Sequence, residues 1–223
     1  MGSDYVLLPP EPADEILEKV LAFRSGYEQR QPAEDLPALL DLFPRVGVRD
    51  GYVLDYVQET TREGVTMPIR AFARPHDDDS WMPMFDTTAD PERDELLEEL
   101  YQYVECEPSP EGLFEYAFFA VELASVRASA HVSEWPESTP IFSEARFDSF
   151  LEQAAKVSDL KRPEHFGPRV CCGEGRGGKV RLLVYTPMGW ERIYCLDITV
   201  DAEGFVEQDA GDIVADMGSG MIF

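Results

Sequence analysis

Positive charge is scarce in this chain of 223 residues. Only 19 lysine and arginine residues stand against 44 aspartate and glutamate residues, so the formal net charge is −25 at pH 7. Nucleic acids and anionic membrane surfaces both attract proteins through clustered lysine and arginine side chains. The shortage of these side chains therefore removes nucleic acid and membrane from the partners that we expect.

Cysteine and long apolar runs are also scarce. Two of the four cysteines are adjacent, Cys171 and Cys172, and the other two, Cys106 and Cys195, are distant, so neither a C-x-x-C metal motif nor a regular disulfide framework occurs. No apolar stretch reaches the ~18 residues of a membrane-spanning helix, and the first residues show no signal-peptide pattern. We therefore expect a soluble, cytoplasmic protein with free thiols, and we predict no bound cofactor or metal.

Apolar residues are plentiful enough for a folded core, since 44% of the chain is hydrophobic and 11% is aromatic. Helical spacing of these residues predicts helices that begin near Pro12, Leu36, Pro91, Ser109 and Ser143. The helix that begins near Ser109 is apolar on nearly all sides, so we expect it at the centre of the fold.

Strand patterns occur in two places. A β-hairpin is predicted near 51–74, and an antiparallel β meander is predicted from about 168 onward. Alternating β-α-β units are absent from the sequence pattern, which favours an α+β fold. The sequence thus predicts an α+β protein that is mainly helical in its N-terminal and central part. We expect a single domain over 1–223, with a possible division into 1–160 and 168–223.

The stretch CGEGRGGKV, residues 172–180, matches two nucleotide-binding patterns, G-x-G-x-x-G and G-x-x-x-x-G-K. Both patterns need a helix after the glycines, because the phosphate binds the free N–H groups at the helix N-terminus. Here the residues after Gly178 have the composition of a strand, and Val180 stands where the phosphate loop needs serine or threonine. The glycines therefore predict a hairpin loop and no nucleotide site.

Glu115 and Glu122 lie seven residues apart on the most apolar predicted helix. If they are buried alone, their pKa values are raised and they could act as acid and base. The structural alternative is an exposed or arginine-paired row of glutamates. A cysteine nucleophile would need a base, and His165 is the histidine closest in sequence to Cys171 and Cys172.

The densest acidic cluster is the run of His76, Asp77, Asp78 and Asp79, with Trp81 close behind it. It lacks the ligand spacing of a calcium-binding loop, so a solvated loop or a partner-binding loop is expected there. Aromatic side chains inside a polar rim are common in interface hot spots. Asp77, Asp78, Asp79 and Trp81 are therefore the candidate partner-binding residues.

The leading functional hypothesis is an acidic protein that binds a basic protein partner, as an inhibitor or a toxin-neutralising protein would. Its basis is the net charge, because a strongly negative field steers a positive partner to the surface. One alternative is a hydrolase-type enzyme whose carboxylates or cysteine come together from distant segments. Another is a structural or regulatory domain without a ligand of its own.

Overall fold

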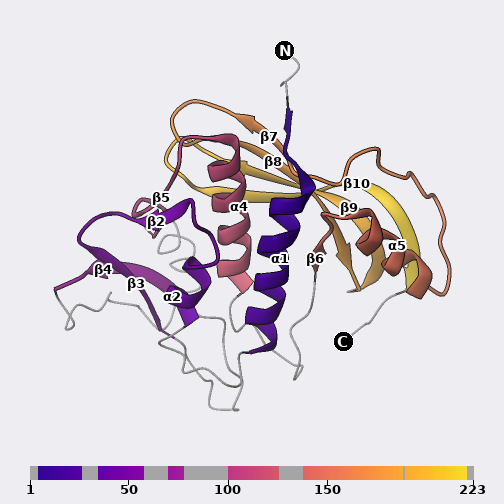
Figure 1. The fold of residues 1–223 in the computed structure, drawn as a ribbon, viewed down its shortest axis with the longest axis horizontal. Helices are drawn as coiled ribbons and strands as arrows, with labels where there is room; N and C mark the ends of the chain where they lie inside the picture. Colours follow the sequence, from indigo (N-terminus) through magenta and orange to yellow (C-terminus); the bar gives the residue numbers. More distant parts are fainter. Residues whose placement is uncertain are drawn as a thin grey trace.

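The computed structural model contains one large antiparallel sheet with helices packed on it (Figure 1). The residues that it describes are 5–26, 35–57, 70–77, 100–125, 138–187 and 189–219. The strands of the large sheet are β1 (Val6–Leu7), β6 (Thr139–Pro140), β7 (Arg169–Cys172), β8 (Gly178–Thr186), β9 (Trp190–Val200) and β10 (Val206–Ser219). Their order is β1-β7-β8-β9-β10, with β6 beside β8, so β10 is an edge strand of this sheet.

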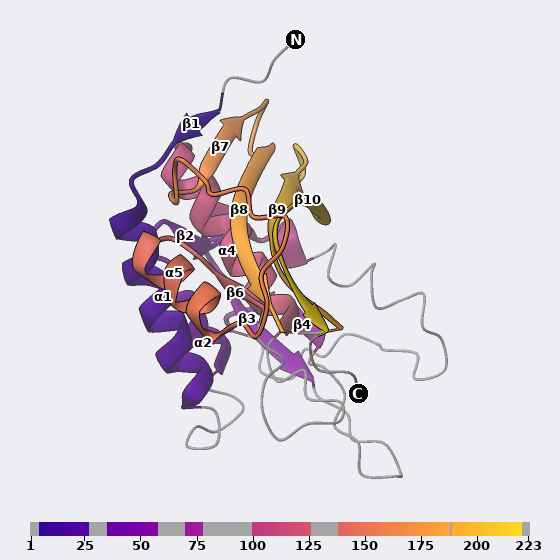
Figure 2. The same cartoon turned by 90° about the vertical axis from the view of Figure 1, so that its right-hand side faces the viewer.

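Helices and two small sheets complete the described fold. The helices are α1 (Pro10–Ser25), α2 (Asp35–Leu40), α4 (Pro110–Ser125) and α5 (Glu144–Gln153). The small sheets pair β2 (Val46–Val48) with β5 (Val104–Cys106) and β3 (Tyr52–Val57) with β4 (Arg70–Pro75). α1 and α4 run side by side on one side of the large sheet (Figure 2).

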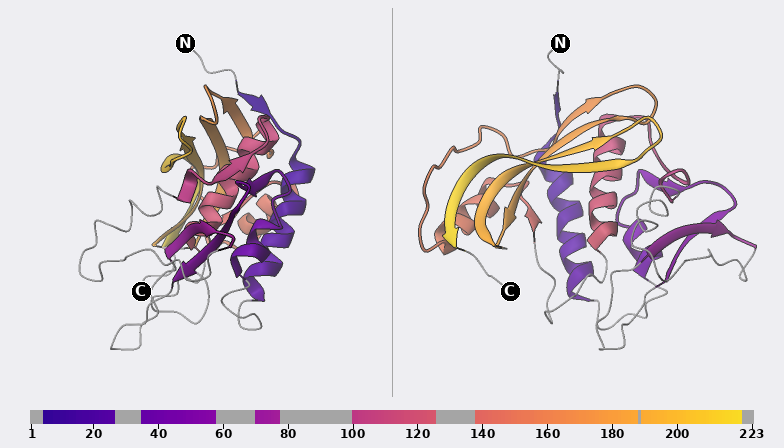
Figure 3. Two further views of the ribbon diagram at one scale, coloured as in Figure 1. Left: turned by 90° about the vertical axis from the view of Figure 1, so that its left-hand side faces the viewer. Right: turned by 180° about the vertical axis from the view of Figure 1, so that it is seen from behind.

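The two faces of the large sheet bury different side chains. Alternate residues of β8 and β9, including Leu182 and Ile198, are buried in the main core with α4. Ile193, on the opposite face of β9, packs in a second cluster with Phe147 of α5. α5 therefore covers the far end of the sheet on the face away from α4, where β9 and β10 curve over it (Figure 3).

The prediction of a mainly helical N-terminal and central part is wrong. That part also contains the strands β1 to β6, and two of them belong to the large sheet. β2 and β5 have only three residues each, which is too short for strand alternation to stand out against helical spacing. β1 and β6 form because they pair with β7 and β8, which lie far away in the sequence.

Several expected elements are present. β3 and β4 form the hairpin expected near 51–74, and β7 to β10 form the antiparallel meander expected from about 168. α5 begins at its predicted cap, Ser143, whose hydroxyl accepts a hydrogen bond from the Arg146 N–H. The helix expected near Pro91 lies outside the described residues, apart from two helical residues at 100–101. The single-domain assignment stays a prediction.

Candidate functional site

Most of the predicted partner-binding residues lie outside the described ranges. Asp78, Asp79 and Trp81 fall in the part of the chain that the structure leaves undescribed. Asp77 is fully exposed just beyond β4, and its carboxylate lies 3.1 Å from Nδ1 of His76. The role of this cluster in partner binding therefore stays a prediction.

The glycine-rich stretch forms the predicted hairpin loop between β7 and β8. The N–H of Gly173 donates to the carbonyl of Gly177 over 2.8 Å, and Gly175 has a φ of 62°, which favours glycine. β8 begins directly at Gly178, so the loop leads into a strand and not into the helix that both nucleotide-binding patterns need. A side chain at Gly178 would collide with Leu113 of α4 and with the main chain of β7. The glycines here allow a tight turn and a close approach between sheet and helix.

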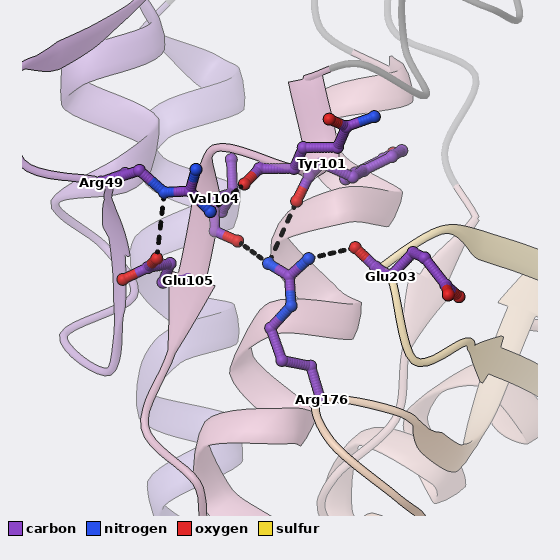
Figure 4. A network of polar contacts seen from close by, with 7 residues as sticks. Arg49, Tyr101, Val104, Glu105, Arg176 and Glu203 are labelled. Carbon is purple, nitrogen blue, oxygen red and sulfur yellow. Dashed lines mark hydrogen bonds and ion pairs between the residues drawn. The ribbon is translucent and has the colours of Figure 1, made fainter.

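Arg176, in the same loop, is an anchor between three segments (Figure 4). Its Nη1 donates to the carbonyl oxygens of Tyr101 and Val104, at 3.2 and 2.6 Å, and its Nη2 donates to the carbonyl oxygen of Glu203. These contacts join the β7–β8 loop to the β9–β10 turn and to the start of β5. Sequence reasoning missed this role, because a single arginine among glycines carries no local signal of it.

Glu122 of α4 is buried and held by Arg24 of α1. The Arg24 guanidinium donates from Nε and Nη2 to the two carboxylate oxygens of Glu122, at 3.1 and 2.8 Å. Burial raises the pKa of Glu122, and the charge of Arg24 works against this rise. The pair ties α4 to α1 inside the helical layer.

Glu115 lies two helical turns before Glu122 on α4 and has a different arginine partner. Its carboxylate accepts from the main-chain N–H of Arg45 at 2.8 Å and from the Nη1 of the same residue at 2.5 Å. Glu115 and Glu122 are therefore both paired with arginine, as the structural alternative expected, and both are buried. Because each carboxylate binds its own guanidinium, the two do not form an acid and base pair.

The cysteines show no sign of activation in the described part of the chain. All four are free, and burial raises the thiol pKa of Cys106, Cys172 and Cys195, which disfavours the nucleophilic thiolate. His165 lines a surface cleft in which neither Cys171 nor Cys172 takes part. A catalytic pairing of this histidine with either cysteine gains no support.

That cleft, of about 360 Å³, opens between the first turns of α1 and α5. It is lined by Pro10, Glu11, Asp14, Phe142, Ser143, Glu144, Glu164, His165 and Phe166. Glu11 and Glu144 stand in the first turns of their helices, where a carboxylate stabilises the helix dipole. Glu144 also accepts from Arg162 at 2.6 Å. These two carboxylates of the cleft thus have structural roles.

The sheet face away from α4 is polar at the end near the glycine-rich loop. Arg169, Arg181, Asp197 and Asp209 stand in register on the four adjacent strands β7 to β10. Arg181 binds Asp197 through two hydrogen bonds of 2.6 and 2.9 Å. Within the described ranges no element covers this end of the face (Figure 3), as expected for an antiparallel sheet with one solvated side.

The first half of β10, residues 206–213, is a free strand edge, which we name the β10 edge. Among the described residues it has β9 on one side and no strand on the other. The second half differs, because Ser158 and Lys161 donate main-chain hydrogen bonds to Asp216 and Val214. The side chains of the β10 edge are mostly exposed, including those of Glu207, Gln208, Asp209, Ala210 and Asp212.

Most arginines of the described chain are neutralised within the molecule. The arginines in ion pairs are Arg24, Arg45, Arg49, Arg74, Arg146, Arg162 and Arg181. By contrast, Glu207, Asp209 and Asp212 form no ion pair with any described residue. Sequence reasoning missed these three carboxylates, although the alternation of Glu207 and Asp209 in a predicted strand was a visible signal.

Comparison with protein-family models, with curated proteins and with solved structures finds no match to this chain. None of the helices in the described ranges combines the length and hydropathy needed to cross a membrane.

Proposed function

We propose that this chain acts by binding a basic protein, as an inhibitor or a toxin-neutralising protein would. The observation that carries the proposal is that the positive and negative side chains differ in how many of them form ion pairs. Most of the described arginines form ion pairs within the molecule, whereas Glu207, Asp209 and Asp212 are exposed on one strand and form no ion pair with a described residue. A surface of this kind attracts and orients a positively charged partner.

The hydrolase alternative has less support. It needs carboxylates or a thiol that converge on one point, and Glu115 and Glu122 instead bind two different arginines. We also propose a cytoplasmic location, which is supported by the four free thiols.

Affinity capture at two salt concentrations tests the proposal. The immobilised chain is exposed to lysate of its own source cells in about 0.1 M and then about 1 M sodium chloride, where the Debye length falls from about 10 Å to about 3 Å. We expect mass spectrometry to find basic proteins that are retained at low salt and released at high salt.

An unrelated acidic protein of the same net charge is the control for simple ion exchange. A true partner is retained by this chain and not by the control. A retained set without an excess of basic proteins, or one identical to that of the control, would contradict the proposal and favour a structural domain without a ligand.

A further inference from the structure

The β10 edge offers main-chain hydrogen-bonding groups to an added strand. The N–H of Asp201 donates to the carbonyl of Phe205 at 3.0 Å, which fixes the alternation of the β9–β10 ladder. Glu207 and Asp209 then belong to the pairs that bond to β9. The N–H and C=O groups of Val206, Gln208 and Ala210 therefore point away from the sheet, toward the open side.

The side chains of the same edge separate by face. Glu207 and Asp209 lie on the polar face, in register with Thr199 and Asp197 of β9. The side chain of Gln208 lies on the other face, the one that carries the main core. An added strand thus meets carboxylates at every second position and small or neutral side chains between them.

The charges of the edge select among possible occupants. A second copy of this chain, adding through its own β10 edge, would bring carboxylates against carboxylates, and like charges across a strand pair are destabilising. A strand with lysine or arginine at alternate positions would meet Glu207 and Asp209 with opposite charge. In an antiparallel addition these residues face each other in the closer, non-hydrogen-bonded kind of pair.

We propose that the β10 edge docks an extended basic segment of a partner protein as an additional antiparallel strand, with lysine or arginine at alternate positions opposite Glu207 and Asp209. This inference rests on the proposed function and names the surface and the partner's chemistry. Main-chain hydrogen bonds give such strand addition its affinity, and the alternate side chains give its specificity.

A synthetic peptide of about eight residues, a usual strand length, tests the inference. Arginine and threonine alternate in it, and a second peptide carries proline in place of each threonine. In the proposed register the threonine N–H groups point to β10, so the proline peptide keeps the charge and loses the ladder. Fluorescence anisotropy is expected to show binding of the first peptide and at least tenfold weaker binding of the second, since both charge and main chain are needed.

Charge variants of the chain provide a second test of the inference. The triple variant Glu207→Gln, Asp209→Asn and Asp212→Asn is expected to bind the arginine–threonine peptide about fivefold to tenfold more weakly, as loss of a few exposed ion pairs predicts. The matched control neutralises three exposed carboxylates elsewhere, with Glu15→Gln, Glu152→Gln and Glu174→Gln. It removes the same net charge and is expected to keep the wild-type affinity.

A variant that removes one main-chain N–H provides a third test. Proline is tolerated at an edge position whose N–H faces outward, so Gln208→Pro removes a docking donor while the β9 ladder stays intact. We expect a native circular-dichroism spectrum and at least tenfold weaker peptide binding. Equal affinity of wild-type and Gln208→Pro chains for the peptide, or equal affinity of the chain for both peptides, would overturn the inference. So would a dimer of this chain that Gln208→Pro abolishes.

Failure of the β10-edge inference can be distinguished from failure of the proposed function. If a basic protein captured from lysate binds the Gln208→Pro and triple variants as tightly as the wild type, the function stands and the β10 edge is not its site. If no basic protein is captured, the function itself fails.

Discussion

At the scale of single residues, the buried glutamates of α4 show how this acidic chain uses its few positive charges. Glu122 lies among the aromatic and aliphatic side chains of the main core, and its carboxylate is neutralised by a guanidinium from another helix. A buried ion pair is weak evidence for stability as a whole, but removing one partner leaves an uncompensated buried charge. The consequence is measurable in variants of Arg24.

Arg24→Leu is expected to lower the free energy of unfolding by about 3–5 kcal/mol at pH 7, because Glu122 loses its only charged neighbour among the described residues. Urea denaturation measures this change. Arg49→Leu is the matched control, since the pair of Arg49 with Glu105 is exposed and contributes at most about 1 kcal/mol. Equal losses in the two variants would show that Glu122 is not held in a desolvated site.

The same variant is expected to have a characteristic pH dependence. Burial raises the pKa of Glu122, and without Arg24 no other described residue opposes this rise. A group whose folded pKa is raised binds more protons in the folded state, so its contribution to stability is lost as pH increases. The deficit of Arg24→Leu relative to wild type should therefore shrink as the pH is lowered from 7 toward the ordinary carboxyl pKa of 4.5. A deficit that grows on acidification would contradict this explanation.

At the scale of elements, the loop between β7 and β8 illustrates what local pattern reveals and what it leaves open. The strand composition after Gly178 was enough to predict a hairpin, and the β7–β8 pairing confirms that hairpin. The hydrogen-bond partners of Arg176 could not be predicted from the sequence, because Tyr101, Val104 and Glu203 come from other parts of the chain. The short strands β2 and β5 were not predicted for the same reason, since only their pairing with each other defines them.

Arg176→Met is expected to destabilise the fold by about 2 kcal/mol or more, because charge-assisted hydrogen bonds to three carbonyl groups are lost. Hydrogen exchange should show faster exchange in the β7–β8 loop and the β9–β10 turn together, since one side chain joins them. Lys179→Met, at an exposed position of β8, is the control and should leave both segments protected. Faster exchange in only one of the two segments would show that Arg176 does not couple them.

At the scale of the whole molecule, the net charge of −25 sets the response to salt. With 44 acidic against 19 basic residues, we expect mutual repulsion among carboxylates to outweigh the internal ion pairs and so to destabilise the compact state. We expect the free energy of unfolding to rise when sodium chloride increases from about 0.01 M to about 0.1 M, as the Debye length falls from about 30 Å to about 10 Å. Urea denaturation at each concentration measures it, and a fall would mean that attractive pairs dominate.

The sequence alone determined the acidic surface, the antiparallel character of the C-terminal strands, the apolar α4 and the hairpin function of the glycines. These properties depend on composition or on the period of one segment, and both can be observed along the chain. Only the tertiary structure decided that β10 is the edge of the sheet, that Glu115 and Glu122 bind separate arginines, and that the first part contains strands. The physical reason is that strand order and ion-pair partners depend on contacts between residues distant in sequence, which no local period encodes.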